Sequence, residues 1–275
     1  MKAMILAAGL GTRLRPLTED RPKALVTVAG RTMLEIALQR LRSFGVREVI
    51  VNTHHHASMI ADYLQANHNF GMSIQISFEP ELLDTGGGLK HATPFFLDSS
   101  ASPQEPFILH NVDVLSTIDL ARMVRFHVEH QALATLAVQD RATSRLLLFD
   151  QQGRLCGRRT TRAKITDAAM SDQAQADREQ ADQAQAQEVQ TEWALPAAPV
   201  QALAFSGIHV LSPRIFAEMP EEGAFSIIPA YLRLAAQGEI IAAFRADEFY
   251  WRDLGRPESI QQAAQDMASG MYPVT

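Results

Sequence analysis

The sequence predicts an α/β fold in which helices cover both faces of a mostly parallel sheet. Short apolar strands alternate with helical segments along the first half of the chain, and a glycine-rich loop directly follows the first strand. The 275 residues, 47% hydrophobic and 20% charged, are enough to bury one large core. In such sheets ligands gather at the carboxyl ends of the strands, so we expect the functional site there.

The first β-loop-α-β unit begins at the N-terminus. Met1–Ala8 is an apolar run that ends in glycines, and Arg47–Asn52 is rich in β-branched residues, so both predict strands. Between them, Met33–Phe44 carries apolar residues at helical spacing, and Gly45 follows it as a C-cap. Units of this kind build parallel sheets.

The same criteria predict the other regular elements. In the first half they are a helix at Ala57–Ala66, a strand at Ser73–Phe78, a helix after Gly86 and a strand at Pro106–Asn111. In the second half they are a strand at Ala202–Leu211, a helix at Phe225–Gln237, a strand at Glu239–Phe244 and a helix at Pro257–Ala268.

Residues 166–190 differ from the rest of the chain. They consist mainly of Gln, Ala, Asp and Glu, and the run Asp-Gln-Ala-Gln-Ala occurs at Asp172 and again at Asp182. Such a composition tolerates a helix but offers no apolar face for packing. We therefore expect a mobile or loosely helical insertion that carries no function.

Charge and hydropathy exclude several classes of function. Gly9 and Gly11 break the apolar N-terminal run too early for a signal or membrane segment, so we expect a cytoplasmic protein. A formal net charge of −6 argues against partners such as nucleic acid or an anionic membrane, which need clustered Lys and Arg. The single cysteine, Cys156, has no disulfide partner, and we expect an inert thiol that is at least half-buried.

The most informative segment is the loop at residues 6–23. Gly9 and Gly11 allow backbone N–H groups to approach a phosphate chain without obstruction by side chains. Arg13 and Lys23 add fixed positive charge where a triphosphate carries its excess negative charge. The spacing matches neither the Walker A motif nor the complete dinucleotide fingerprint. The glycines alone would fit a tight turn with solvated basic residues equally well.

The whole motif resembles the signature loop of the sugar-1-phosphate nucleotidyltransferase family. The family pattern Gly-x-Gly-Thr-Arg-Leu-x-Pro-Leu-Thr is matched at residues 9–18, and its Pro-Lys at Pro22-Lys23. Further matching segments occur in the family's order at Glu79, residues 84–88, 111–113, 205–208 and 251–258. The resemblance implies a Rossmann-like, three-layer nucleotide-diphospho-sugar transferase fold. It also implies a single domain over residues 1–275, with a triphosphate-binding half at about 1–115 and a sugar-phosphate-facing half at about 116–275.

The resemblance also implies a reaction. The phosphate oxygen of the sugar attacks the α-phosphorus of a nucleoside triphosphate in line, and pyrophosphate leaves, so positioning and charge neutralisation carry the catalysis. Arg13, Lys23 and Asp113 are the implied catalytic residues. Asp113 and Asp253 are implied to hold Mg²⁺, a hard ion that prefers oxygen ligands. A lone Asp at a strand end is otherwise a common cap or turn residue.

Further ligand contacts follow from the resemblance. The implied nucleotide-binding residues are Leu6, Ala8, Gly9, Gly11, Thr12, Arg13, Lys23, Glu79, Gly86 and Gly87. Consecutive glycines at residues 86–88 would let the backbone approach the flat base. Glu79 would contact the base or ribose, unless it is an exposed carboxylate at a strand end. The implied substrate-binding residues are Asn111, Gly207 and Arg252, although Gly207 would also fit close backbone packing.

Two departures from the family pattern concern the substrate and the metal loop. The lysine that holds the sugar phosphate in some branches has no clear counterpart, and Arg145, Arg252 or Lys164 could replace it. Val112 stands where the family usually has Gly before the metal-binding carboxylate. His54, His55 and His56 are not expected to form a metal site, because consecutive side chains point in different directions.

Within the family, the chain most resembles enzymes that join UTP to N-acetylmuramate 1-phosphate, and short mannose-1-phosphate guanylyltransferase-like proteins. UTP is favoured over GTP, and the oligomeric state, monomer or small homo-oligomer, stays open. A non-catalytic regulatory protein that binds an NDP-sugar is disfavoured because Arg13, Lys23 and both aspartates are present. A nucleotide-binding oxidoreductase is disfavoured because Asn52-Thr53 stands where an acidic residue would bind the ribose.

Overall fold

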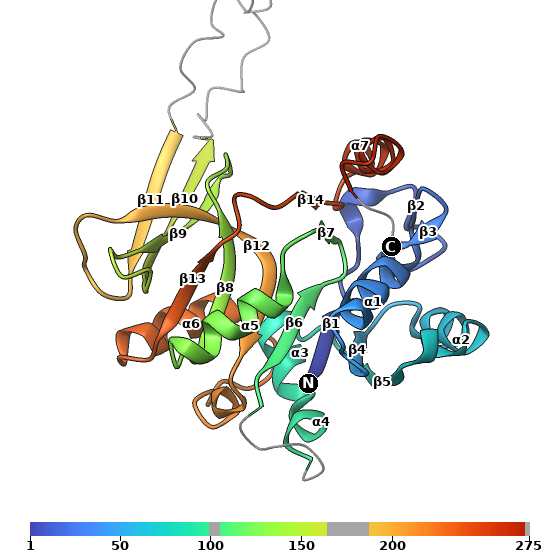
Figure 1. Ribbon diagram of the computed structural model, residues 1–275, viewed down its shortest axis with the longest axis horizontal. Coiled ribbons are helices and arrows are strands. Elements are labelled where there is room, and N and C mark those ends of the chain that lie inside the picture. The colour runs from blue at the N-terminus through green and yellow to red at the C-terminus, as the bar shows by residue number, and fades with distance from the viewer. Residues whose placement is uncertain (99–104, 164–186, 273–275) are drawn as a thin grey trace, which may run out of the picture.

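The computed structural model describes residues 1–98, 105–163 and 187–272. Its main sheet has ten strands, with the order β11-β10-β9-β12-β6-β1-β4-β5, and β8 and β13 extend it from β12 (Figure 1). The strands are β1 (Lys2–Leu6), β4 (Glu48–Thr53), β5 (Ser73–Phe78), β6 (Phe107–Asn111), β8 (Ala134–Gln139), β9 (Arg145–Phe149), β10 (Leu155–Ala163), β11 (Gln187–Trp193), β12 (Gln201–Leu211) and β13 (Ile241–Arg245).

The first half of the sheet is parallel, as predicted. β1 lies between β4 and β6, with Leu6 opposite Asn52 on one side and Asn111 on the other. β5 continues this parallel part beyond β4. The carboxyl ends of these strands therefore meet at one edge, where the loop after β1 also begins.

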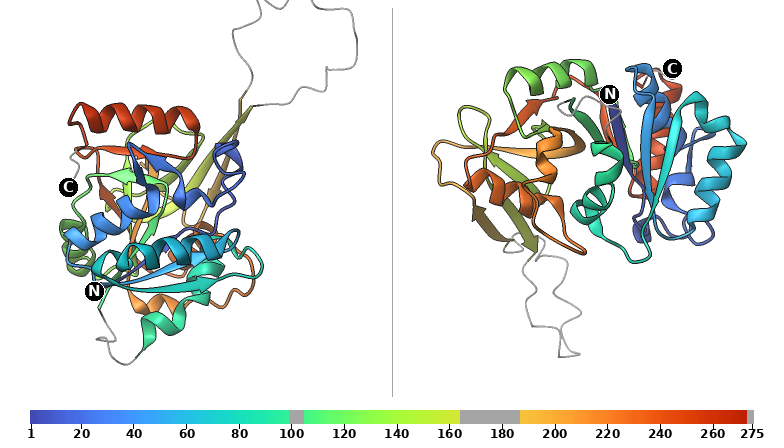
Figure 2. Two further views of the ribbon diagram at one scale, coloured as in Figure 1. Left: turned by 90° about the vertical axis from the view of Figure 1, so that its right-hand side faces the viewer. Right: turned by 90° about the horizontal axis from the view of Figure 1, so that it is seen from below.

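Helices cover both faces of the sheet, which confirms the predicted three-layer α/β fold (Figure 2). Side chains alternate along β1, so Ala3 and Ile5 face one apolar cluster while Met4 faces the other. The first cluster packs against α1 (Met33–Ser43), α2 (Ala57–Ala66), α5 (Leu120–Glu129) and α7 (Pro257–Ala268). The second packs against α3 (Asp84–His91), α4 (Thr93–Leu97) and α6 (Ile227–Ala236).

The second half of the sheet departs from the parallel pattern. β12 runs antiparallel to β6, β8 and β9, and β9, β10 and β11 form an antiparallel meander. β11 begins at Gln187, so the predicted insertion was wrong for residues 187–190, which pair with β10. Most of the predicted insertion, residues 166–186, lies outside the described residues. Cys156 on β10 is buried as predicted, and its Sγ donates to the carbonyl of Leu148 at 3.3 Å.

Smaller elements connect distant parts of the chain. A two-stranded ribbon pairs β7 (Val114–Ser116) with β14 (Trp251–Asp253), and a second pairs β2 (Thr27–Val28) with β3 (Arg31–Thr32). In Figure 1 the C-terminal helix α7 lies beside the N-terminal β2. Short 3-10 turns occur at η1 (Thr12–Leu14), η2 (Lys23–Leu25), η3 (His68–Gly71) and η4 (Pro213–Phe216). Within the described ranges, no helix is long and apolar enough to cross a membrane.

The helix predicted after Gly86 begins earlier, at Asp84, so the consecutive glycines lie inside α3. The N–H groups of Gly86 and Gly87 donate to the carbonyl of Phe225 at 2.9 and 3.2 Å. A Cβ on Gly87 would lie 2.3 Å from the carbonyl oxygen of Gly223. These glycines therefore allow α3 to pack directly against the backbone before α6.

We predict that Gly87→Ala lowers the free energy of unfolding by about 1–3 kcal/mol, because the added methyl group meets backbone that has little room to move. Urea denaturation would measure the change. The matched control is Gly9→Ala, where a Cβ meets nothing within 4 Å. Equal stability of the two variants would contradict the packing role of Gly87.

Candidate active site

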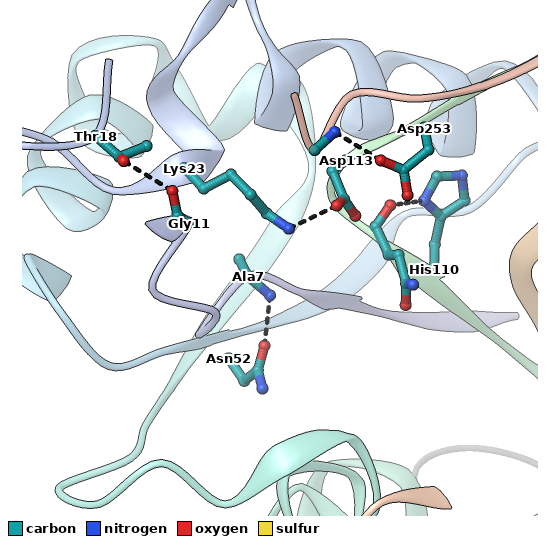
Figure 3. A network of polar contacts seen from close by, with 10 residues as sticks. Ala7, Gly11, Thr18, Lys23, Asn52, His110, Asp113 and Asp253 are labelled. Carbon is teal, nitrogen blue, oxygen red and sulfur yellow. Dashed lines mark hydrogen bonds and ion pairs between the residues drawn. The ribbon is translucent and has the colours of Figure 1, made fainter. Parts of the chain in front are cut away.

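The buried side chain of Asn52, at the end of β4, holds the loop that follows β1. Its Oδ1 accepts a hydrogen bond from the N–H of Ala7 at 2.6 Å (Figure 3) and another from the N–H of Ala8 at 3.3 Å. Both N–H groups are thereby engaged within the protein. The backbone groups that remain for a ligand begin at Gly9, one residue later than the predicted contact at Ala8.

Glu79 is fully buried, and its carboxylate binds the protein rather than facing solvent. Oε1 accepts from Nδ2 of Asn52 at 2.7 Å, and Oε2 accepts from the N–H of Leu83 at 3.0 Å. Neither the predicted contact with a base nor the exposed alternative matches this geometry. Glu79 instead connects Asn52 to the segment before α3.

The loop after β1 leaves a row of backbone donors unpaired. Within the described ranges, the N–H groups of Gly9, Leu10 and Gly11 have no acceptor. Gly11 adopts a left-handed φ of 64° and accepts a hydrogen bond from the Thr18 hydroxyl at 2.9 Å. Free N–H groups arranged in this way form a binding site for phosphate oxygens.

A cavity of about 270 Å³ lies over these donors. Its lining residues are Gly9, Leu10, Gly11, Thr12, Arg13, Lys23, Leu82 and Gly255. Five of these were predicted nucleotide-binding residues. Leu10, Leu82 and Gly255 were missed, although Leu10 and Gly255 lie inside motifs that the sequence analysis identified. Leu82 is exposed in the structure, and in the sequence only its position just before the glycine-rich segment could have indicated it.

Lys23 and Asp113 form an ion pair at the rim of this cavity. Lys23 Nζ lies 2.7 Å from Asp113 Oδ2, and their side chains are only 15% and 10% exposed (Figure 3). The pair joins η2 to the turn after β6. A mostly buried ion pair of this length fixes the positions of both groups and is screened little by salt.

The ribbon of β7 and β14 brings Asp253 beside Asp113. Asp253 lies opposite Val114, and the N–H of Leu254 donates to the carbonyl of Asp113 at 2.8 Å. Asp253 Oδ1 accepts from the N–H of Gly255 at 2.7 Å, so each carboxylate has one oxygen with no partner in the described part of the chain. Two hard oxygen donors side by side, next to a phosphate cradle, suit a magnesium ion.

Asp113 and Asp253 are the two carboxylates that meet at this site. No group of three or more His, Cys, Asp or Glu side chains among the described residues could hold a metal ion. Mg²⁺ usually keeps waters and substrate phosphate oxygens in its shell, so it does not require three protein ligands. The guanidinium of Arg13 also lies close to Gly255, since a Cβ on this glycine would be 3.2 Å from Arg13 Nη2 and 2.7 Å from Asp253 Oδ1.

Asn111 and Gly207, two predicted substrate contacts, lie against each other on β6 and β12. Gly207 has a φ of 74°, and the register of β12 shifts between Phe205 and His209. A Cβ on Gly207 would lie 2.8 Å from Val114 Cγ2 and 3.0 Å from Asn111 Nδ2. The irregular backbone and the missing side chain therefore both serve this close approach.

Three other predicted residues do not join the cavity. Arg252 binds Asp266 through its Nη2 at 2.8 Å and the Tyr250 hydroxyl through its Nε at 3.0 Å, so α7 engages its guanidinium. Gly86 and Gly87 are buried in α3, against the segment that precedes α6. Of the other candidates for a sugar-phosphate contact, Arg145 is exposed on β9, and Lys164 lies outside the described residues.

Histidines lie close to the site but carry other contacts. His110, beneath Asn111, is fully buried, and burial lowers its pKa to about 4, so the ring is neutral at pH 7. Its Nδ1 donates to the carbonyl of Asn111 at 2.8 Å (Figure 3). His54 Nδ1 lies 2.8 Å from the carbonyl of Glu79, and the rings of His55 and His56 contact each other at an interplanar angle of 52°.

The chain matches the family model described as nucleotidyl transferase over residues 2–146. It is 30% identical over 265 residues to an N-acetylmuramate α-1-phosphate uridylyltransferase of Caulobacter vibrioides. This match covers 94% of this chain and 93% of the relative. It is 37% identical over 139 residues to a probable mannose-1-phosphate guanylyltransferase of Oryza sativa. That match covers 50% of this chain and 38% of the relative.

A solved structure has the same fold. HddC from Yersinia pseudotuberculosis, complexed with GMP-PN, aligns with a TM-score of 0.68 over 97% of this chain and 99% of that protein. The two sequences are 20% identical. This likeness extends the fold comparison beyond residues 2–146 to nearly the whole chain.

We predict that Asn52→Ala lowers the free energy of unfolding by about 2–4 kcal/mol, because it leaves a buried N–H and a buried carboxylate oxygen without partners. The change is measured by urea denaturation. Asn67→Ala is the control, since the exposed Asn67 bonds only the carbonyl of Tyr63 and should change stability by less than about 0.5 kcal/mol. A loss at Asn52 no larger than the control's would refute the anchoring role.

Proposed function

The chain belongs to the nucleotidyl transferase family and is a sugar-1-phosphate nucleotidyltransferase, and we propose that it joins UTP to N-acetylmuramate 1-phosphate. The products are then a UDP-sugar and pyrophosphate. The single observation that supports the local chemistry best is the meeting of two aspartates, two basic residues and unpaired backbone donors at one cavity. A reaction that concentrates negative charge on phosphate oxygens needs this combination.

The residues divide the task between them. The N–H groups of Gly9 and Gly11 bind the phosphate chain, and Arg13 and Lys23 neutralise the charge that grows on the departing pyrophosphate. The acceptor's phosphate oxygen forms a bond to the α-phosphorus, while the bond from that phosphorus to the pyrophosphate oxygen breaks. Because the acceptor arrives as a phosphate anion, the transfer needs no side chain to remove a proton from it.

Asp113 and Asp253 would hold the magnesium ion, with phosphate oxygens and water completing its shell. Bound Mg²⁺ supplies Lewis-acid stabilisation of charge on the α-phosphate. Lys23 already donates to Oδ2 of Asp113, so it holds that carboxylate in a fixed orientation. The second oxygens of both aspartates are the ones available to the ion.

The coverage of the relatives supports the choice of acceptor. The similarity to the Caulobacter uridylyltransferase extends over both halves of the chain, including the half that we expect to face the sugar. N-acetylmuramate 1-phosphate would come from cell-wall material, which fits a role in peptidoglycan recycling in the cytoplasm. The second candidate is a mannose-1-phosphate guanylyltransferase, favoured by the 37% identity to the Oryza protein over 139 residues.

The decisive assay measures pyrophosphate release with Mg²⁺ for five triphosphates, UTP, GTP, dTTP, CTP and ATP. Each is paired with the 1-phosphates of N-acetylmuramate, N-acetylglucosamine, glucose and mannose. We expect the highest kcat/KM for UTP with N-acetylmuramate 1-phosphate, and loss of all turnover with EDTA because the charge on the α-phosphate is then uncompensated. A preference for GTP with mannose 1-phosphate would replace the proposal by the second candidate. A folded protein without turnover on any pair would favour the regulatory alternative.

We further predict that Asp113→Asn lowers kcat by at least about 100-fold, because an amide oxygen is a weaker ligand for Mg²⁺ than a carboxylate oxygen. Its far-UV circular dichroism should match that of the unchanged protein, since Oδ1 of the new amide can still accept from Lys23, while loss of one charge of the mostly buried pair lowers its thermal unfolding midpoint. Asp62→Asn, at an exposed position on α2, is the control for the same chemical change. Full activity of the Asp113 variant would remove Asp113 from the proposed site.

A further inference from the structure

A third cation lies on the sugar-facing side of the site, at Arg141 just after β8. Its guanidinium carbon is 3.7 Å from the centre of the Trp251 ring, and its Nη2 donates to the carbonyl of Phe205 at 2.7 Å. We propose that Arg141 binds the phosphate group of the acceptor sugar 1-phosphate. This inference rests on the proposed function and names a residue that recognises the second substrate.

Strand β14 determines which way this cation faces. Side chains alternate along a strand, so Trp251 and Asp253 lie on the same face, and Arg252 lies on the opposite face with Asp266. The ring that supports Arg141 is thus on the same side as the carboxylate of Asp253. Burial lowers the pKa of Arg141, while the charge of Asp253 acts in the opposite sense, and the guanidinium remains protonated at pH 7.

Three separate elements hold Arg141 in place. Trp251 Nε1 donates to the carbonyl of Ser206 at 2.8 Å, next to the Phe205 carbonyl that Arg141 itself binds. Both carbonyls belong to the irregular part of β12, immediately before Gly207. The end of β8, β12 and β14 therefore fix one guanidinium, and a fixed fork loses little entropy when it binds an anion.

The guanidinium of Arg141 has N–H groups that no acceptor among the described residues uses. Its Nε is buried and has no partner in the described part of the chain, and the hydrogen bond to Phe205 uses only Nη2. Nη1 has no acceptor among the described residues either, and unlike Nε it is not closed off from solvent, so it is a donor that an anion can reach. Phosphate oxygens match the forked donors of arginine.

The location favours the acceptor phosphate over those of the triphosphate. The nucleotide-side cations, Arg13 and Lys23, line the cavity over the loop after β1. Arg141 instead comes from the second half, where it binds the carbonyl of Phe205, two residues before Gly207. The attacking phosphate must approach the two aspartates from somewhere other than the triphosphate cavity, and Arg141 provides positive charge on that side. It thus takes the role for which the sequence offered Arg145, Arg252 and Lys164.

The test compares Arg141→Gln and Arg141→Lys with Arg125→Gln, a loss of the same charge at an exposed position on α5. For Arg141→Gln we expect the KM for the sugar 1-phosphate to rise about 10- to 100-fold, the range of a charge-assisted hydrogen bond. The KM for UTP should stay within about twofold of the unchanged protein. Arg141→Lys should recover part of the loss, because it restores the charge without the fork. A rise confined to the KM for UTP would overturn the inference.

Direct binding separates this inference from the proposed function. Calorimetry with N-acetylmuramate 1-phosphate and N-acetylglucosamine 1-phosphate should show the same fractional loss of affinity in Arg141→Gln, because both carry the phosphate. A loss confined to the muramate compound would assign Arg141 to its lactyl carboxylate and overturn the inference. If the unchanged protein binds these ligands through Arg141 but turns none over, the proposed function fails and the inference stands. Equal affinity with and without Arg141, or no binding at all, overturns it.

Discussion

The geometry of the site depends on the amide of Asn52. Because β1 and β4 are parallel and in register, this side chain reaches the first N–H groups of the loop after β1 and the carboxylate of Glu79. Glu79 in turn holds Leu83, next to the cavity residue Leu82. The loop after β1 and the segment that contains Leu82, which both line the cavity, are therefore joined by one chain of hydrogen bonds. Gly88 belongs to the same arrangement, since a Cβ there would lie 2.6 Å from Glu79 Oε1.

Charge at the site is contributed by segments far apart in the sequence. The first half supplies Arg13, Lys23 and Asp113, and the second half supplies Asp253. The ribbon of β7 and β14 sets the distance between the aspartates through backbone pairing, without any direct contact between the carboxylates themselves. The site is therefore complete only when both halves of the chain have folded together.

Sequence periodicity was sufficient for the parallel half of the fold. Ser73–Phe78 and Ala57–Ala66 were predicted with the bounds that the structure has, because their patterns match the periods of a strand and a helix. Strand β10, next to the outermost strand β11, carries arginine and threonine on both faces. It has no alternation of apolar and polar residues, so the sequence did not predict it as a strand. The aspartates and the glycine loop were recognisable as motifs.

Other parts of the site depend on tertiary contacts that no local pattern contains. Glu79 lies at a strand end, where solvent exposure is the usual expectation, and only the approach of Asn52 and Leu83 makes it a buried acceptor. Arg252 and Arg141 carry the same charge, and the sequence alone does not distinguish their roles. The alternation of side chains along β14 and the irregular backbone of β12 place Arg252 against α7 and Arg141 on the side of Asp253.

Strand β12 has a further consequence for how the chain is made. It pairs with β6, β8 and β9, so the edge of β6 stays uncovered on the ribosome until β12 emerges, and a nascent chain must be protected from strand-edge association during that interval.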